Sequence, residues 1–138
     1  MSATQSTGPE KAAPAGGWRH PHVVAALAWF LPGCGHLVMG RMLRAGVFAA
    51  VVIAAFVTGV ALDGELATPT RGQPLTWLAF FARVGNGALF VAAKLADLGR
   101  GDVSAGSFAF GNTFIYTAGL MNLLAMLDAG DIARGTKD

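Results

Sequence analysis

The chain has 138 residues, of which 54% are hydrophobic and only 13% are charged. Soluble domains carry about 25% charged residues, so this composition excludes a disordered chain and argues against a soluble globule. The formal net charge of +2 is modest, and no basic run interleaved with aromatic residues indicates nucleic-acid binding. The composition therefore predicts a small integral membrane protein.

The N-terminal segment, MSATQSTGPEKAAPAGG, is polar and rich in small residues, with no apolar repeat. We expect residues 1–20 to form a disordered polar tail and residues 21–135 to form a helical transmembrane domain. The first apolar run starts only at Val23 and soon meets Pro32 and Gly33, so cleavage as a secretory signal peptide is not expected.

Four apolar runs follow the tail, at residues 23–39, 45–62, 75–93 and 108–127. A bilayer core about 30 Å thick needs roughly 20 helical residues, with about 17 to 25 workable. Because an unpaired backbone group is costly in lipid, each run should be helical. The sequence predicts an all-α membrane bundle of four helices in two hairpins.

In an alternative arrangement, the first run is a re-entrant segment that enters and leaves the membrane on the same side, and only three true spans remain. Pro32 removes a backbone donor, and the flanking glycines loosen the helix. Basic residues near the termini favour cytoplasmic termini. In the four-span arrangement, however, Arg41 and Arg44 fall on the opposite side, and a re-entrant first segment would remove that conflict.

The most patterned stretch surrounds this proline, and we interpret it as a structural turn formed by Pro32, Gly33, Gly35, His36, Gly40 and Arg41. Its glycines allow the backbone to bend and a second helix to approach closely. His36 in or near the membrane needs a polar partner. It is either a proton-responsive or ligand-binding group, or a structural one that bonds a free carbonyl, and we favour the structural role.

Two segments carry a resemblance. WFLPGCGHLVMGRMLRAGVFAAVVIAAFVTG resembles the two-helix transmembrane domain family, with its glycine turn, histidine and Gly-Arg pair before a second helix. GNTFIYTAGLMNLLAMLDAGDIARG resembles the ending of a family of uncharacterised small bacterial membrane proteins; Asn122, Asp128 and Asp131 match its pattern, whereas Met121 and Gly130 depart from it. The resemblance implies a multi-pass location in the bacterial inner membrane and no known activity.

Polar residues inside the apolar runs mark a second candidate region, made of Arg83, Asn86, Asn122 and Asp128. A mid-membrane arginine costs about 2.5 to 3.5 kcal/mol on insertion scales, so Arg83 should face the bundle interior. Asn86 lies three residues on and shares its helix face. We expect these two residues to form an interior polar cluster with the fourth run, either as an ion path or, as we favour, as a packing contact.

The sequence contains no catalytic, metal or phosphate-binding signature, so we expect no enzyme activity, no cofactor and no metal. The expected partners are the lipid bilayer and either other membrane proteins or a second copy; nucleic acid is not expected, and the sequence leaves a small-molecule ligand undetermined. The favoured function is that of a structural or accessory subunit acting through helix packing. The alternatives are a small transporter or channel component, and a membrane enzyme centred on Cys34 and His36.

Overall fold

The computed structural model describes residues 20–68 and 72–136, so the expected tail lies outside the described residues except for His20. The expected all-α class is confirmed, because these residues form helices and no strand; Glu65 and Arg100 make one isolated bridge. Six helices follow one another: α1 (Pro21–Phe30), α2 (Cys34–Val38), α3 (Met42–Ala61), α4 (Pro74–Val84), α5 (Ala88–Leu95) and α6 (Phe108–Ala133).

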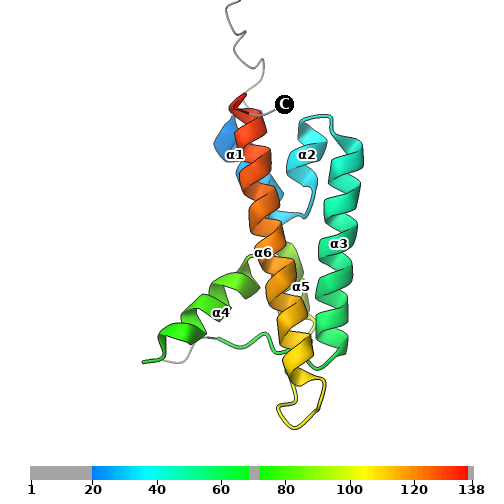
Figure 1. Cartoon of the computed structure of the whole chain (residues 1–138), viewed down its shortest axis with the longest axis vertical. Helices are drawn as coiled ribbons and strands as arrows, with labels where there is room; N and C mark the ends of the chain where they lie inside the picture. Colours follow the sequence, from blue (N-terminus) through cyan, green and yellow to red (C-terminus); the bar gives the residue numbers. More distant parts are fainter. Residues whose placement is uncertain (1–19, 69–71, 137–138) are drawn as a thin grey trace, which may run out of the picture.

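Two long helices, α3 and α6, lie side by side along the length of the molecule (Figure 1). They are antiparallel, because Gly59 near the end of α3 meets Gly111 and Ile115 near the start of α6. Small residues on α6, including Gly111, Ala118 and Ala125, are buried and allow this close approach. At 1.5 Å per residue, the 20 residues of α3 extend about 30 Å, enough to cross a bilayer core.

The first apolar run is broken between α1 and α2. Pro32 cannot donate a backbone hydrogen bond, and Gly33 adopts a left-handed φ of +84° that only glycine reaches without strain. The chain then folds back, so that Gly35 packs against Ala28 of α1 and Ala129 of α6. The first segment therefore folds back instead of continuing as one helix, and its re-entry into a membrane stays a prediction.

The third apolar run is broken as well, because α4 and α5 are bent by 98° at Gly85, Asn86 and Gly87. Gly87 has a φ of +57°, and a Cβ there would overlap the carbonyl oxygen of Trp29. The bend brings the second break directly against the first, since the end of α1 fills the place that a side chain at Gly87 would occupy.

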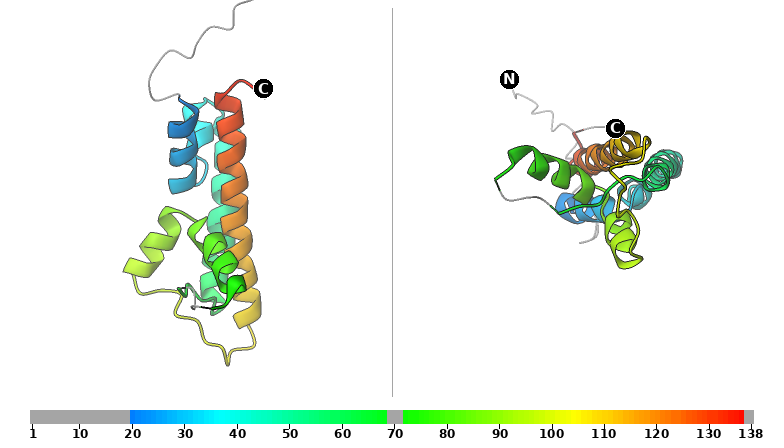
Figure 2. Two further views of the ribbon diagram at one scale, coloured as in Figure 1. Left: turned by 90° about the vertical axis from the view of Figure 1, so that its left-hand side faces the viewer. Right: turned by 90° about the horizontal axis from the view of Figure 1, so that it is seen from below.

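The two halves of the chain share one order of elements: a short helix beginning with proline at Pro21 or Pro74, a break that contains glycine, a second short helix and a long helix. Figure 2 shows α1 and α2 in the upper half, α4 and α5 in the lower half, and α6 passing both. Because α3 and α6 run in opposite directions, the halves have opposite orientations, as in proteins built from inverted repeats.

The expected bundle of four spans in two hairpins needs correction. Among the described residues, α3 and α6 are long and apolar enough to cross a membrane, and the count rises to three if the bent α4–α5 pair is one span. The ten residues of α1 are too few, because they extend only about 15 Å. Apolar composition made runs one and three look continuous, whereas the Pro-Gly and Gly-Asn-Gly breaks redirect the backbone within each.

Candidate functional site

A buried asparagine on α6 forms hydrogen bonds with both helix breaks. The amide nitrogen of Asn122 donates to the carbonyl oxygen of Trp29 at 2.9 Å and to that of Gly85 at 2.8 Å. Both carbonyls lie where a helix ends, so neither has the partner that a continuing helix would supply. Asn122 is fully buried, so each bond replaces water that cannot reach these groups.

A second buried asparagine lies within the lower break. The amide nitrogen of Asn86 donates to the carbonyl of Arg83 at 3.0 Å and to that of Ile115 on α6 at 3.1 Å. The Oδ1 atoms of Asn86 and Asn122 have no hydrogen-bond partner among the described residues. The two asparagines therefore join α1, α4 and α6 through backbone carbonyls.

Arg83 is almost completely buried at the end of α4, with 6% of its surface exposed. Its guanidinium donates to the Tyr116 hydroxyl at 2.9 Å and to the Ala67 carbonyl at 3.1 Å, and it lies 5.2 Å from the centre of the Tyr116 ring. Nε has no partner within the described part of the chain. The contact with α6 thus passes through Tyr116, which sequence reasoning did not identify because a tyrosine in an apolar run carries no distinctive signal.

His36 and Asp128 form a separate pair near the other end of α6. The imidazole Nε2 lies 3.1 Å from the Asp128 carboxylate, and the ring packs on Phe48 with centroids 5.1 Å apart. His36 is fully buried, whereas 30% of the Asp128 side chain is exposed. The partner of His36 is therefore this carboxylate instead of a carbonyl freed by Pro32, and Asp128 lies with His36 instead of with Arg83.

The remaining turn residues lie close to His36. Pro32 and Gly33 form the break itself, and Gly35 belongs to α2. Gly40, with a φ of +77°, and Arg41 connect α2 to α3, and the Arg41 backbone N–H donates to the His36 carbonyl at 2.8 Å. The predicted turn residues therefore surround one folded-back segment, and the interior polar candidates divide between Arg83–Tyr116, the two asparagines and His36–Asp128.

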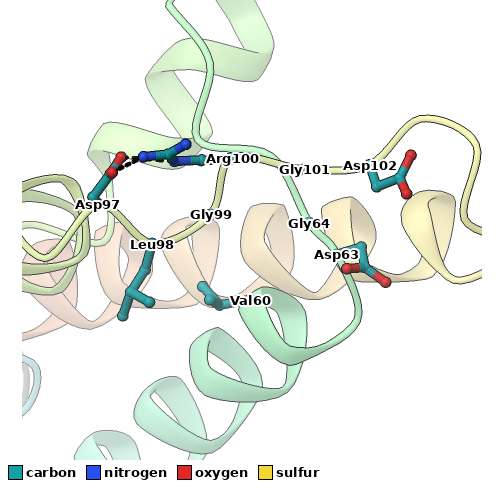
Figure 3. A pocket seen from close by; sticks show the side chains of 9 residues that line it. All are labelled: Val60, Asp63, Gly64, Asp97, Leu98, Gly99, Arg100, Gly101 and Asp102. Carbon is teal, nitrogen blue, oxygen red and sulfur yellow. Dashed lines mark hydrogen bonds and ion pairs between the residues drawn. The ribbon is translucent and has the colours of Figure 1, made fainter.

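A hollow of about 300 Å³ lies among the loops after α3 and α5 (Figure 3). Its carboxylates are held by neighbouring groups: Asp97 pairs with Arg100, and Asp63 accepts a hydrogen bond from Ser107 at 2.9 Å. Hydrogen bonds from the Ser104 hydroxyl and backbone N–H hold the pKa of Asp102 below its ordinary value of 3.8. The carboxylates therefore order these two loops, and their local bonds account for them without a ligand.

Replacing Asp128 with alanine is expected to destabilise the protein by about 1 to 3 kcal/mol, because it leaves the buried Nε2 of His36 without its acceptor. Asp128→Asn retains a carbonyl oxygen that can accept the same bond and should lose less. Thermal unfolding of the three proteins in detergent micelles measures the difference. Equal stability of Asp128→Ala and the unmodified protein would contradict this role.

These features define an all-helical protein with two helices, or three if the bent pair is one span, that can cross a membrane. The chain belongs to a family of unknown function, DUF6677, which matches residues 23–138. No curated protein and no solved structure matches the chain. The expected membership of an uncharacterised family is confirmed, and the resemblance to the two-helix transmembrane domain family stays a prediction.

Proposed function

We propose that this chain is a non-enzymatic, multi-pass protein of the inner bacterial membrane that acts as a structural or accessory subunit through helix packing. The observation that carries the proposal is the bonding of Asn122, whose amide is occupied by the carbonyls of Trp29 and Gly85. These hydrogen bonds hold the ends of the broken helices against α6, so the polar side chain stabilises helix packing. The proposed partners are the bilayer and either other membrane proteins or a second copy.

The outer surface supports the same proposal. Large apolar side chains on the outer faces of α3 and α4 are exposed, among them Leu43 at 82% and Leu75 at 81%. An apolar surface of this kind suits contact with lipid tails or with apolar helices of another membrane protein.

Charge favours cytoplasmic termini for the proposed membrane protein. Because α1 and α2 fold back, the start of α3, with Arg41 just before it and Arg44 in its first turn, lies at the same end of the molecule as the end of α6, which Arg134 follows. The loop after α5, which contains Arg100, lies at the other end (Figure 1). An excess of arginine and lysine marks cytoplasmic segments. The conflict that a four-span arrangement creates for Arg41 and Arg44 therefore disappears.

A transporter or channel component is the second candidate, and unpaired buried polar atoms favour it. These are Oδ1 of Asn86 and Asn122, Nδ1 of His36 and Nε of Arg83, within the described ranges. Broken helices that meet near mid-membrane are typical of transporters. Spare acceptors on Asn86 and Asn122 are suited to contact a cation or a water molecule passing between the breaks.

Reconstitution of the full chain separates the two candidates. For a structural subunit, we expect vesicles containing the protein to leak protons and K⁺ no faster than protein-free vesicles. We also expect the chain, extracted from its native membrane in mild detergent, to migrate in a complex larger than its 14.2 kDa protomer. Leakage of either ion above the protein-free rate would overturn the structural role and support the transport candidate. Migration as a monomer without leakage would contradict both.

A further inference from the structure

Two cavities between α4 and α6 adjoin each other and differ in chemistry. The first, of about 430 Å³, is lined by polar side chains of Glu65, Thr68, Thr76, Arg83 and Tyr116. The second, of about 300 Å³, is lined by Leu78, Ala82 and Leu120 on its own side. Leu75, Ala79 and Tyr116 line both cavities and therefore form their junction. The combined space has a polar end and an apolar end, as an amphiphile does.

The polar end contains the buried guanidinium of Arg83, which forms no ion pair within the described residues, although the Glu65 carboxylate also lines this cavity. Arg83 is bonded to a carbonyl and a hydroxyl, its Nε is unpaired, and no carboxylate of residues 20–68 and 72–136 lies within ion-pairing distance of it. A buried charge is costly unless an opposite charge compensates it. An anion in the cavity would supply that charge, and a phosphate oxygen is a strong acceptor for a guanidinium.

The order of the two ends along α6 matches the order within a lipid leaflet. The Glu65 backbone N–H bonds to the side chain of Asn112, which places this loop at the level of the first turns of α6. Tyr116 lies one helical turn, about 5.4 Å, further along, and Leu120 lies one turn beyond it. The sequence of levels is therefore polar loop, Arg83–Tyr116 and then apolar groove.

We propose that this cavity binds one anionic phospholipid, with the phosphate against Arg83 and one acyl chain in the groove between α4 and α6. The guanidinium of Arg83, which has no carboxylate partner in the described part of the chain, favours an anionic headgroup, and the apolar residues of the second cavity favour an acyl chain. Leu78 at the groove is 70% exposed, so the second acyl chain remains in the surrounding bilayer. Glu65, whose side chain packs against Gly101, opposes the phosphate and limits the affinity.

The test uses the full chain purified in an uncharged detergent and native mass spectrometry with equal amounts of phosphatidylglycerol and phosphatidylcholine. We expect the unmodified protein to retain phosphatidylglycerol with a roughly tenfold or greater preference, since Arg–phosphate bonds are charge-assisted. Arg83→Gln should bring the preference near parity, and Glu65→Gln should increase it. Equal retention of the two lipids by the unmodified protein would overturn the proposal.

A second variant keeps the test decisive if Arg83→Gln does not fold. Ala79→Phe fills the junction of the two cavities without removing the Arg83 bonds, and it should reduce lipid retention several-fold. Ala92→Phe places the same bulk on an exposed position of α5 outside the cavity and should retain lipid normally. Unchanged retention in Ala79→Phe would overturn the proposal.

Competition with oleate identifies the occupant. A phospholipid site should keep phosphatidylglycerol in the presence of equimolar oleate, whereas displacement would assign the site to a free fatty acid and overturn the phospholipid proposal. The inference rests on membrane insertion, which carbonate extraction of membranes tests separately. Extraction of the chain would therefore count against the proposed membrane role, and loss of lipid preference alone would count only against this site.

Discussion

Replacing Gly119 with alanine is expected to destabilise the protein by about 2 to 3 kcal/mol. A Cβ at this position of α6 would overlap the carbonyl oxygen of Ala82 and lie 2.9 Å from its carbonyl carbon. It would also lie 2.8 Å from the amide nitrogen of Asn86. The overlapped atoms are backbone, which cannot rotate away, so α4 would have to move as a unit.

Thermal unfolding in detergent micelles measures this effect, and Gly130→Ala provides a control in the same helix. A Cβ at Gly130 meets only Ala25, at an ordinary 3.8 Å. Alanine is a better helix former than glycine by up to about 1 kcal/mol, so this control should be neutral or slightly stabilising. Equal midpoints for the two variants would show that α4 does not pack on Gly119.

Replacing Asn122 with alanine is expected to lower the free energy of unfolding by about 2 kcal/mol, because the carbonyls of Trp29 and Gly85 both lose the amide group that donates to them. This estimate is smaller than the combined cost of leaving two buried acceptors without a donor, because a hydrogen bond between side chains in a membrane protein contributes only about 0.6 kcal/mol on average. The loss should appear as a lower unfolding midpoint and as earlier proteolysis at the Trp29–Gly33 and Gly85–Gly87 breaks, which Asn122 holds together.

Thr117→Ala is the matched control, because Thr117 lies on the exposed side of α6 and its hydroxyl donates to the Thr113 carbonyl of its own helix. This substitution should change stability by less than about 0.5 kcal/mol. If Asn122→Ala were as stable as Thr117→Ala, the two breaks would be held together by packing alone, and the proposed structural role of Asn122 would be wrong.

These predictions concern contacts for which the sequence identified the polar residues but not their partners. Asn122 and Asn86 stood out as polar residues in apolar runs, and a polar group in such a run must find a partner. Their actual partners are backbone carbonyls freed by two breaks. The breaks bring together residues that are far apart in the sequence, such as Trp29 and Asn122. No spacing rule within one helix relates such positions, so side-chain pairing between runs could not be deduced from periodicity.

For Arg83 too, the sequence predicted burial but not the partners. The cost of a charge in lipid correctly indicated an inward-facing side chain, and Arg83 is 6% exposed. Its partners, Tyr116 and the Ala67 carbonyl, depend on the 98° bend after α4, which turns the end of this helix toward α6. Asp128, the charged candidate, is occupied by His36 because α2 folds back against α6 at that level.

The sequence by itself determined that the chain is helical and suited to a membrane, because hydrophobic composition and run length depend on local chemistry alone. It also located the residues whose burial would be costly. Only the tertiary structure decided that two of the four apolar runs are broken and that the breaks meet on α6. The physical reason is that glycine and proline permit a change of direction without prescribing it, whereas the direction taken depends on the carbonyls and side chains that the rest of the chain presents.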